Sequence, residues 1–175
     1  MAGIIKVNQY QDFNGNTLFT SDGNGNLTTQ NLMYPSFHAH SATTSLSNAT
    51  HTTVLFSTKE RDTNNLYDAS TGKFTVTSST TGYYYFYATI GTEVITANRI
   101  QVNLMKNGTA NDNRLATCET QSDTSGYPAP NISRVIPLLS SGDFVMVQAY
   151  QNSGATKVLD GQDNKNFFGA YRIGS

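Results

Sequence analysis

The fold is decided by residues 68–90, DASTGKFTVTSSTTGYYYFYATI, in which two β-rich runs flank a Ser/Thr-rich turn. Successive side chains of a strand point to opposite faces. The second run therefore has two faces, one formed by Tyr84, Phe86, Ala88 and Ile90 and the other by Tyr83, Tyr85 and Tyr87. Both faces are apolar or aromatic, whereas a half-exposed antiparallel strand has a polar outer face. We therefore predict that the second face meets another copy of the chain in an oligomer.

The composition excludes several classes of protein. The 175-residue chain has a net charge of −1 and only 13% charged residues, so we expect no binding to nucleic acid or insertion into a membrane. Its single cysteine excludes an intramolecular disulfide. No apolar window reaches transmembrane length. The first residues lack the pattern of a signal peptide, and we expect none.

The chain divides near residues 31–35. Residues 1–32 are rich in turn-forming Asn and Gly and have too few apolar residues for a core, so we predict an extended anchoring arm that is disordered on its own and ordered by a partner. Residues 33–175 form the main domain. The expected anchors of the arm are its larger apolar side chains, Ile4, Ile5, Val7, Phe13, Leu18 and Phe19.

From Pro35 onward the sequence predicts an all-β domain. Turn-forming pairs such as Asn107-Gly108 and Ser141-Gly142 separate short β-rich runs. We expect strands at residues 35–41, 51–57, 73–79, 83–90, 99–106, 114–119, 132–139, 143–151 and 166–173. This spacing is typical of a β-sandwich or jelly roll, and no helix is expected.

Six short motifs occur in order along this domain. They are PSFHA at 35–39, YDASTGKFTV at 67–76, TTGYYYF at 80–86, LMKNGT at 104–109, LLSSGDFVMVQ at 138–148 and NFFGAY at 166–171. Together they resemble the trimeric jelly-roll family of complement C1q and the tumour necrosis factors, and the resemblance covers roughly residues 35–173. The chain departs from the family in having no Trp and no collagen-like Gly-X-Y run before the domain. The resemblance implies a jelly-roll sandwich of the ten-strand type.

The resemblance also implies a homotrimer. In such trimers one face of the strand at 83–90 lies in the core and the other lies against the threefold axis, which is the division that alternation alone predicts. The expected core residues are Phe37, Phe74, Tyr84, Phe86 and Phe168. The expected trimer-interface residues are Tyr83, Tyr85, Tyr87, Phe167, His38 and His40. Aromatic surfaces of this size contribute much of the energy at protein interfaces.

Residues that could carry chemistry are few. His38 and His40 share one face of a predicted strand, so three copies could surround an ion, although ordinary hydrogen bonding is the simpler interpretation. DGNGN at 22–26 begins like a calcium loop but lacks its later Gly and Glu, and acidic residues at 160–164 are a second weak candidate. No catalytic motif is present. We predict no enzymatic activity, no metal site and no cofactor.

Two non-enzymatic functions remain. The first is a bacteriophage virion surface protein, made in the host cytoplasm. It would be a trimeric capsid decoration (cement) protein, bound to the major capsid protein or another virion protein through residues 1–32. The alternative is a trimeric tail-fibre tip or lectin-like head that recognises a host-surface glycan or protein. We prefer the first because fibre proteins usually carry a longer shaft. The phage context rests on resemblance and composition.

Overall fold

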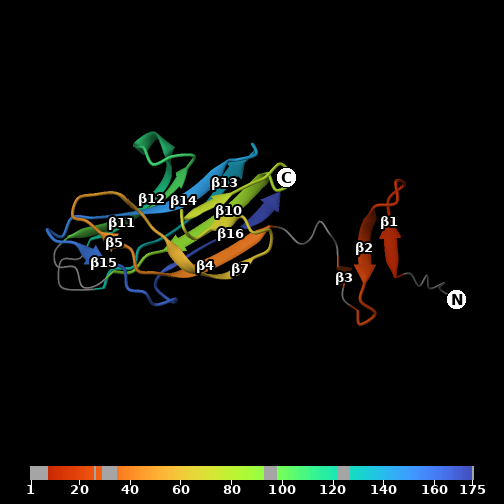
Figure 1. The fold of residues 1–175 in the computed structure, drawn as a ribbon, viewed down its shortest axis with the longest axis horizontal. Coiled ribbons are helices and arrows are strands. Elements are labelled where there is room, and N and C mark those ends of the chain that lie inside the picture. The colour runs from red at the N-terminus through yellow and green to blue at the C-terminus, as the bar shows by residue number, and fades with distance from the viewer. Residues whose placement is uncertain (1–7, 26, 29–34, 93–97, 122–126, 175) are drawn as a thin grey trace. The chain divides into compact units, whose positions relative to one another are not determined.

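The computed structural model describes residues 8–25, 27–28, 35–92, 98–121 and 127–174. The chain forms two compact units, Met1–Tyr34 and Pro35–Ser175, which are described separately (Figure 1). The described residues form strands and one short 3-10 helix, η1 (Asn111–Asn113), so the predicted all-β class is confirmed. Across the described ranges, no helix has the length and apolar character needed to cross a membrane.

The second unit is a sandwich of two antiparallel sheets. The five-stranded sheet has the order β13 (Asn131–Leu138), β10 (Gly82–Thr89), β16 (Phe167–Gly174), β4 (Ser36–Ala42) and β7 (Phe56–Asp62). The six-stranded sheet has the order β12 (Arg114–Gln121), β11 (Arg99–Lys106), β14 (Phe144–Gln151), β9 (Lys73–Thr75) and β8 (Tyr67–Asp68), with β6 (Thr52–Thr53) also paired to β14. A separate pair is formed by β5 (Ser45–Leu46) and β15 (Lys157–Val158). The strands of the five-stranded sheet run side by side in Figure 1.

The core between the two sheets is built from alternate residues of their central strands. All five expected core residues are buried, with at most 2% of each exposed: Phe37, Phe74, Tyr84, Phe86 and Phe168. Their rings form a continuous cluster, with centroids 4.7 Å apart for Phe37 and Phe74 and 4.9 Å apart for Phe37 and Phe168. Such aromatic pairs add about 0.5–1.5 kcal/mol each beyond the area that they bury.

Two buried tyrosines bring hydroxyl groups into this apolar core, and both hydroxyls are satisfied. The Tyr84 hydroxyl donates to the carbonyl of Thr80 at 2.5 Å. The Tyr67 hydroxyl accepts from the amide of Phe56 at 3.1 Å and donates to its carbonyl at 3.3 Å. Burial raises the pKa of each phenol to about 12. Both rings therefore stay neutral and act as apolar packing groups with a fixed polar end.

A strand predicted at 51–57 is wrong in its bounds. The structure divides this segment between β6, which pairs with β14, and β7, which continues to Asp62 at the edge of the other sheet. Only Phe56 of β7 is buried, and the five residues after it are exposed. The alternation that reveals a half-buried strand is therefore missing from β7, because it is a polar edge strand.

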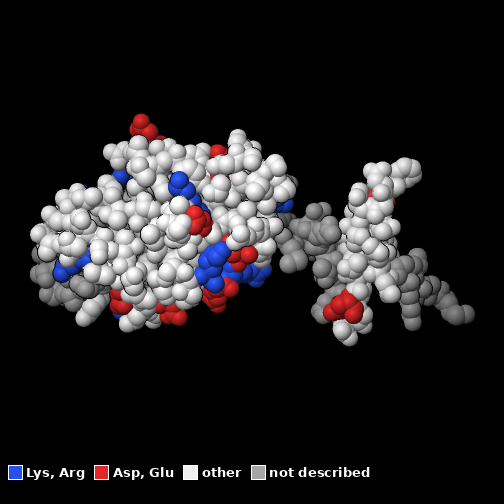
Figure 2. Space-filling model, in the orientation of Figure 1, with Lys and Arg blue, Asp and Glu red and all other residues white. Residues whose placement is uncertain are grey.

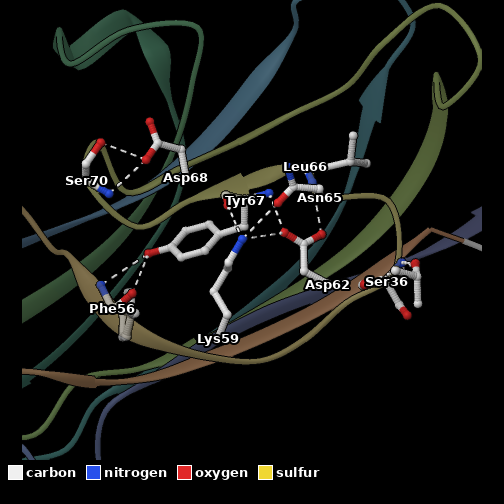
Figure 3. A network of polar contacts seen from close by, with 10 residues as sticks. Ser36, Phe56, Lys59, Asp62, Asn65, Leu66, Tyr67, Asp68 and Ser70 are labelled. Atoms are coloured by element: carbon white, nitrogen blue, oxygen red, sulfur yellow. Dashed lines mark hydrogen bonds and ion pairs between the residues drawn. The ribbon is translucent and has the colours of Figure 1, made fainter.

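The chain passes from β7 in one sheet to β8 in the other through a loop closed by side chains (Figure 3). The Asp62 carboxylate accepts from the amides of Leu66 and Tyr67 at 2.9 and 3.0 Å. The Lys59 ammonium donates to Asn65 Oδ1 at 2.9 Å and lies 3.5 Å from Asp62 Oδ2. Asn65 has a φ of 52°, a conformation that Asn tolerates better than most residues. The loop therefore ties the two sheets together at this end of the sandwich.

The first unit differs from the extended arm that we expected. It contains a three-stranded antiparallel sheet of β1 (Gln9–Gln11), β2 (Thr17–Ser21) and β3 (Leu27–Thr28). Its first turn is closed by Asp12, whose carboxylate accepts from the amides of Asn14 and Asn16 at 2.9 and 2.8 Å, and hydrogen bonds from Asn16 lower the pKa of Asp12. The rings of Tyr10 and Phe19 stack across the strands at 4.4 Å.

Local turn chemistry therefore orders a segment that has no core of its own. Of the expected anchors, Phe13 is fully exposed, Leu18 is 46% exposed and Phe19 is partly buried. Ile4, Ile5 and Val7 lie outside the described residues.

Candidate functional site

The outer face of the five-stranded sheet carries a continuous group of rings, which we call the aromatic face. Its members come from β10, β16 and β4: Tyr85, Tyr87, Phe167, Tyr171, His38 and His40. Strand pairing sets Tyr85 opposite Tyr171 and Phe167 opposite His40. Ring centroids are 5.4 Å apart for Tyr85 and Tyr171, 6.2 Å for Tyr87 and Phe167, and 5.7 Å for Phe167 and His38. Residues distant in sequence therefore make one surface.

Tyr87 is fixed at the centre of the aromatic face. A Cβ atom at Gly169, its neighbour across the strands, would lie 2.4 Å from the end of the Tyr87 ring, so the ring covers the space that a side chain would take. The Tyr87 hydroxyl is 3.1 Å from His38 Nδ1. Burial raises the pKa of Tyr87, and the neighbouring Tyr171 and Glu60 raise it further. The absence of a side chain at Gly169 on β16 thus leaves room for the Tyr87 ring from β10.

His38 links the aromatic face to a charged neighbour. Its Nε2 atom is 3.7 Å from Glu60 Oε2 on β7. Burial lowers the pKa of His38, the nearby Glu60 opposes this shift, and His40 adds to it. His40 contacts Ser41 Oγ through its Nδ1 atom at 2.8 Å. The lowered pKa favours the neutral imidazole, which suits an apolar surface.

The predicted interface residues do not all lie together. Tyr83 is 43% exposed but lies at the start of β10, where the register with β16 shifts. Tyr171 was missed, although it lies four residues after Phe167 on the same strand, so alternation within NFFGAY identifies it. Val135, opposite Tyr85, and Ile173 extend the same face, and both are more than 40% exposed.

Charge lies at one side of this surface. Much of the visible face of the second unit is uncharged, and the charged side chains gather mainly near β4 and β7, beside the His38 end of the aromatic face (Figure 2). Apolar patches of this kind, bordered by polar residues, mark sites of protein interaction. The chemistry that the aromatic face supports is therefore association with another apolar surface.

The residues that could have held a metal are engaged otherwise. In the loop at 160–164, the Asp160 carboxylate lies 2.6 Å from Lys165 Nζ, and this contact lowers the pKa of Asp160. Among the residues that the structure describes, no three His, Cys, Asp or Glu side chains gather as a potential metal site. His51 contacts Arg114 at 3.3 Å and lies apart from the other two histidines, on the ring of Tyr150.

Comparisons with known proteins agree with this architecture. The globular domain of zebrafish complement 1qA matches with a TM-score of 0.57 and 18% identity, over 79% of this chain and 97% of that one. Murine APRIL, crystallised at pH 5.0, matches with a TM-score of 0.60 and 19% identity, over 80% and 99%. Eiger TNF from S. frugiperda matches with a TM-score of 0.57 and 18% identity, over 81% and 94%. The predicted jelly-roll fold is confirmed.

A search of curated proteins found no match. The profile of the C1q domain covers residues 36–171, which include both sheets apart from the last three residues of β16, and all of the aromatic face. C1q and TNF-like domains are often binding or recognition modules and are generally not enzymes. This chain belongs to the C1q domain family.

Proposed function

We propose that this protein is a non-enzymatic homotrimer on the surface of a bacteriophage virion, where it decorates the capsid. The second unit is the displayed head, and the first unit attaches it to the major capsid protein or another virion protein. The single observation that carries the proposal is the aromatic face. Its large side chains are partly exposed, with Tyr171 46% exposed, on one sheet of an otherwise well-packed sandwich.

Trimer formation is supported by the difference between the two outer faces of the head. The aromatic face holds Tyr85, Tyr87 and Phe167, which are all partly exposed, whereas the outward residues Gln101 and Asn103 of the six-stranded sheet are buried within the second unit. Burial of apolar area contributes about 25 cal/mol per Å². Association through the aromatic face alone gives a closed assembly with the six-stranded sheets turned outward, which is the arrangement that the family resemblance implies.

Attachment through the first unit is supported by its exposed apolar groups. Within its described residues, Phe13, Leu18 and Tyr10 are all more than 40% exposed. A three-stranded sheet this small buries little of its own surface, so a partner that covers these groups gains apolar contact without unfolding them. A folded head and a separate unit with apolar groups match the division between display and attachment.

Two measurements test the proposal. Light scattering on the purified protein is expected to give three times the 19.0-kDa mass of the chain, and a monomer would contradict the trimer. Labelling of purified phage particles is expected to place many copies over the capsid. A few copies at the tip of the tail would instead favour the fibre or lectin-like alternative.

Deletion of residues 2–30 separates the two roles. The shortened protein is expected to remain a trimer with nearly unchanged melting, because the core and the aromatic face both lie beyond Pro35. It should no longer bind to particles, whereas the full-length chain does. A shortened protein that falls to monomers would show that the first unit belongs to the trimer itself.

A further inference from the structure

A hollow of about 520 Å³ opens on the six-stranded sheet, on the face turned away from the core. Strand alternation gives this direction, because Val145 and Val147 of β14 lie in the core while Phe144 and Met146 line the hollow. Its volume falls within the range typical of small-molecule sites. We propose that it binds an acidic sugar, that is, a saccharide unit that carries one carboxylate.

The walls of the hollow are rich in hydroxyl groups. Thr53 from β6, Thr71 from the turn before β9 and Thr109 from the loop after β11 all contribute to its lining. Thr53 Oγ1 donates to Met146 Sδ and Thr71 Oγ1 donates to Asp68, so these two oxygens offer lone pairs that can accept from the hydroxyls of a sugar. Met146 adds an apolar floor, which suits the C–H surface of a sugar ring.

One cation gives the hollow its charge preference. Lys73 Nζ lies 4.4 Å from the centroid of the Phe144 ring, which holds the ammonium by a cation–π contact. Lys73 has no carboxylate within ion-pair distance among the described residues. The ammonium is therefore positioned but not neutralised, which lowers the ordering cost of binding an anion.

The acidic residue that faces Lys73 across the strands does not form an ion pair with it. Asp68 lies opposite Lys73 in the β8–β9 pairing. Its carboxylate instead accepts from Ser70 Oγ at 2.7 Å and from Thr71 Oγ1 at 2.9 Å (Figure 3 shows the Ser70 contact). These hydrogen bonds lower the pKa of Asp68 and tie its charge to the turn. Thr71 Oγ1 keeps its lone pairs for a ligand hydroxyl.

Together, the Lys73 ammonium and the hydroxyl groups of the hollow favour one class of ligand. A single ammonium beside several hydroxyls matches one carboxylate on a polyol. The site needs only one copy of the chain and lies on the sheet opposite the aromatic face, so a trimer formed through that face leaves it open. The inference goes beyond the proposed function and does not depend on it.

Titration of the full-length protein with two matched sugars tests the site. Methyl β-D-glucuronide and its neutral counterpart methyl β-D-glucoside differ in one carboxylate, and binding can be followed by amide NMR shifts at Thr53, Thr71 and Thr109. We expect the glucuronide to bind at least about tenfold more tightly, because a hydrogen bond to a charged group contributes more than one to a neutral group. Binding of neither sugar, or equal binding of both, would overturn the proposal.

Two variants assign the effect to the hollow. Lys73→Met keeps the side-chain stem and removes the charge, so the glucuronide affinity should fall to that of the glucoside. Lys157→Met, on β15, removes the same charge outside the hollow and should retain the preference. Thr109→Val should weaken both sugars and tests the site even if Lys73→Met proves unstable. Unchanged affinity in Thr109→Val, or in a folded Lys73→Met protein, would overturn the assignment.

Discussion

Strands β10 and β14 are equal in length and central in their sheets, but their outer faces differ. Both turn apolar side chains to the core, Phe86 from one and Val147 from the other. On the outside, β10 leaves Tyr85 and Tyr87 partly exposed, whereas the middle of β14 is covered, with Met146 and Gln148 both buried. The inward faces specify the sandwich, and the outward faces decide what each sheet meets. The outward face of β10 is thus open along its length, whereas that of β14 is accessible mainly near its two ends, at Phe144 and Tyr150.

The largest effect is expected on the inward face. Phe86→Ala should lower the free energy of unfolding by about 3–5 kcal/mol, because it leaves a cavity among packed aromatic rings. Val147→Ala is the matched change on β14 and should cost less, since fewer buried atoms are removed. Urea denaturation measures both. If Phe86→Ala unfolded like the wild type, the two faces of β10 would be reversed.

The next effect separates the two outer faces. Tyr87→Asp should dissociate the proposed trimer, with a loss of about 2 kcal/mol or more, because it removes a central aromatic contact and adds a charge. Tyr150→Asp makes the same change on β14, beside Arg99 and His51, and should leave the mass unchanged. Light scattering reports both masses. Equal masses for the two variants would remove the distinction between the faces.

A smaller effect tests the space that Gly169 leaves for the Tyr87 ring. Gly169→Ala should lower the free energy of unfolding by about 1–3 kcal/mol, because its new methyl group meets the Tyr87 ring at 2.4 Å and the Phe37 carbonyl at 2.9 Å. Gly174→Ala lies on the same strand with no atom within 4 Å and serves as the control. Thermal melts compare the two. Equal melting would show that the ring moves aside freely.

The smallest effect is expected on the loss of stability at low pH. Burial lowers the pKa of His38 in the fold, so the unfolded chain binds its proton more readily. The contribution of neutral His38 is complete above its unfolded pKa of about 6.5 and is lost as the pH falls toward the lowered value. His38→Gln should therefore reduce the loss of stability between pH 8 and pH 5. His51→Gln, just before β6, should also reduce this loss, because burial and the nearby Arg114 and Arg99 lower the pKa of His51. An identical pH dependence in His38→Gln and the wild type would exclude this role.

Much of the head could be predicted because its information is local. Alternation within residues 83–90 separates the core side of β10 from its outer side, and Phe37 and Phe74 lie in motifs of the same kind. The sequence also contained Tyr171, which the same alternation reaches from Phe167. These residues can be predicted because side chains alternate between the two faces within a single strand.

What could not be predicted depends on contacts between distant segments. The hollow proposed as an acidic-sugar site combines residues near 53, 71–73, 109 and 144–146, which only the folded sheet brings together. β7 could not be recognised because an edge strand with exposed polar residues lacks alternation. The sheet of the first unit depends on carboxylate-closed turns such as that at Asp12, whose strength composition does not reveal.

The edges of the five-stranded sheet have a further consequence. β7 ends the sheet on one side with the exposed charges of Lys59, Glu60 and Arg61, and β13 ends it on the other with Pro137, which has no amide hydrogen to donate. Charged side chains and proline on edge strands oppose the addition of a further strand. In the capsid layer that we propose, these edges oppose strand addition between neighbouring heads, which remain separate folded bodies instead of growing into fibrils.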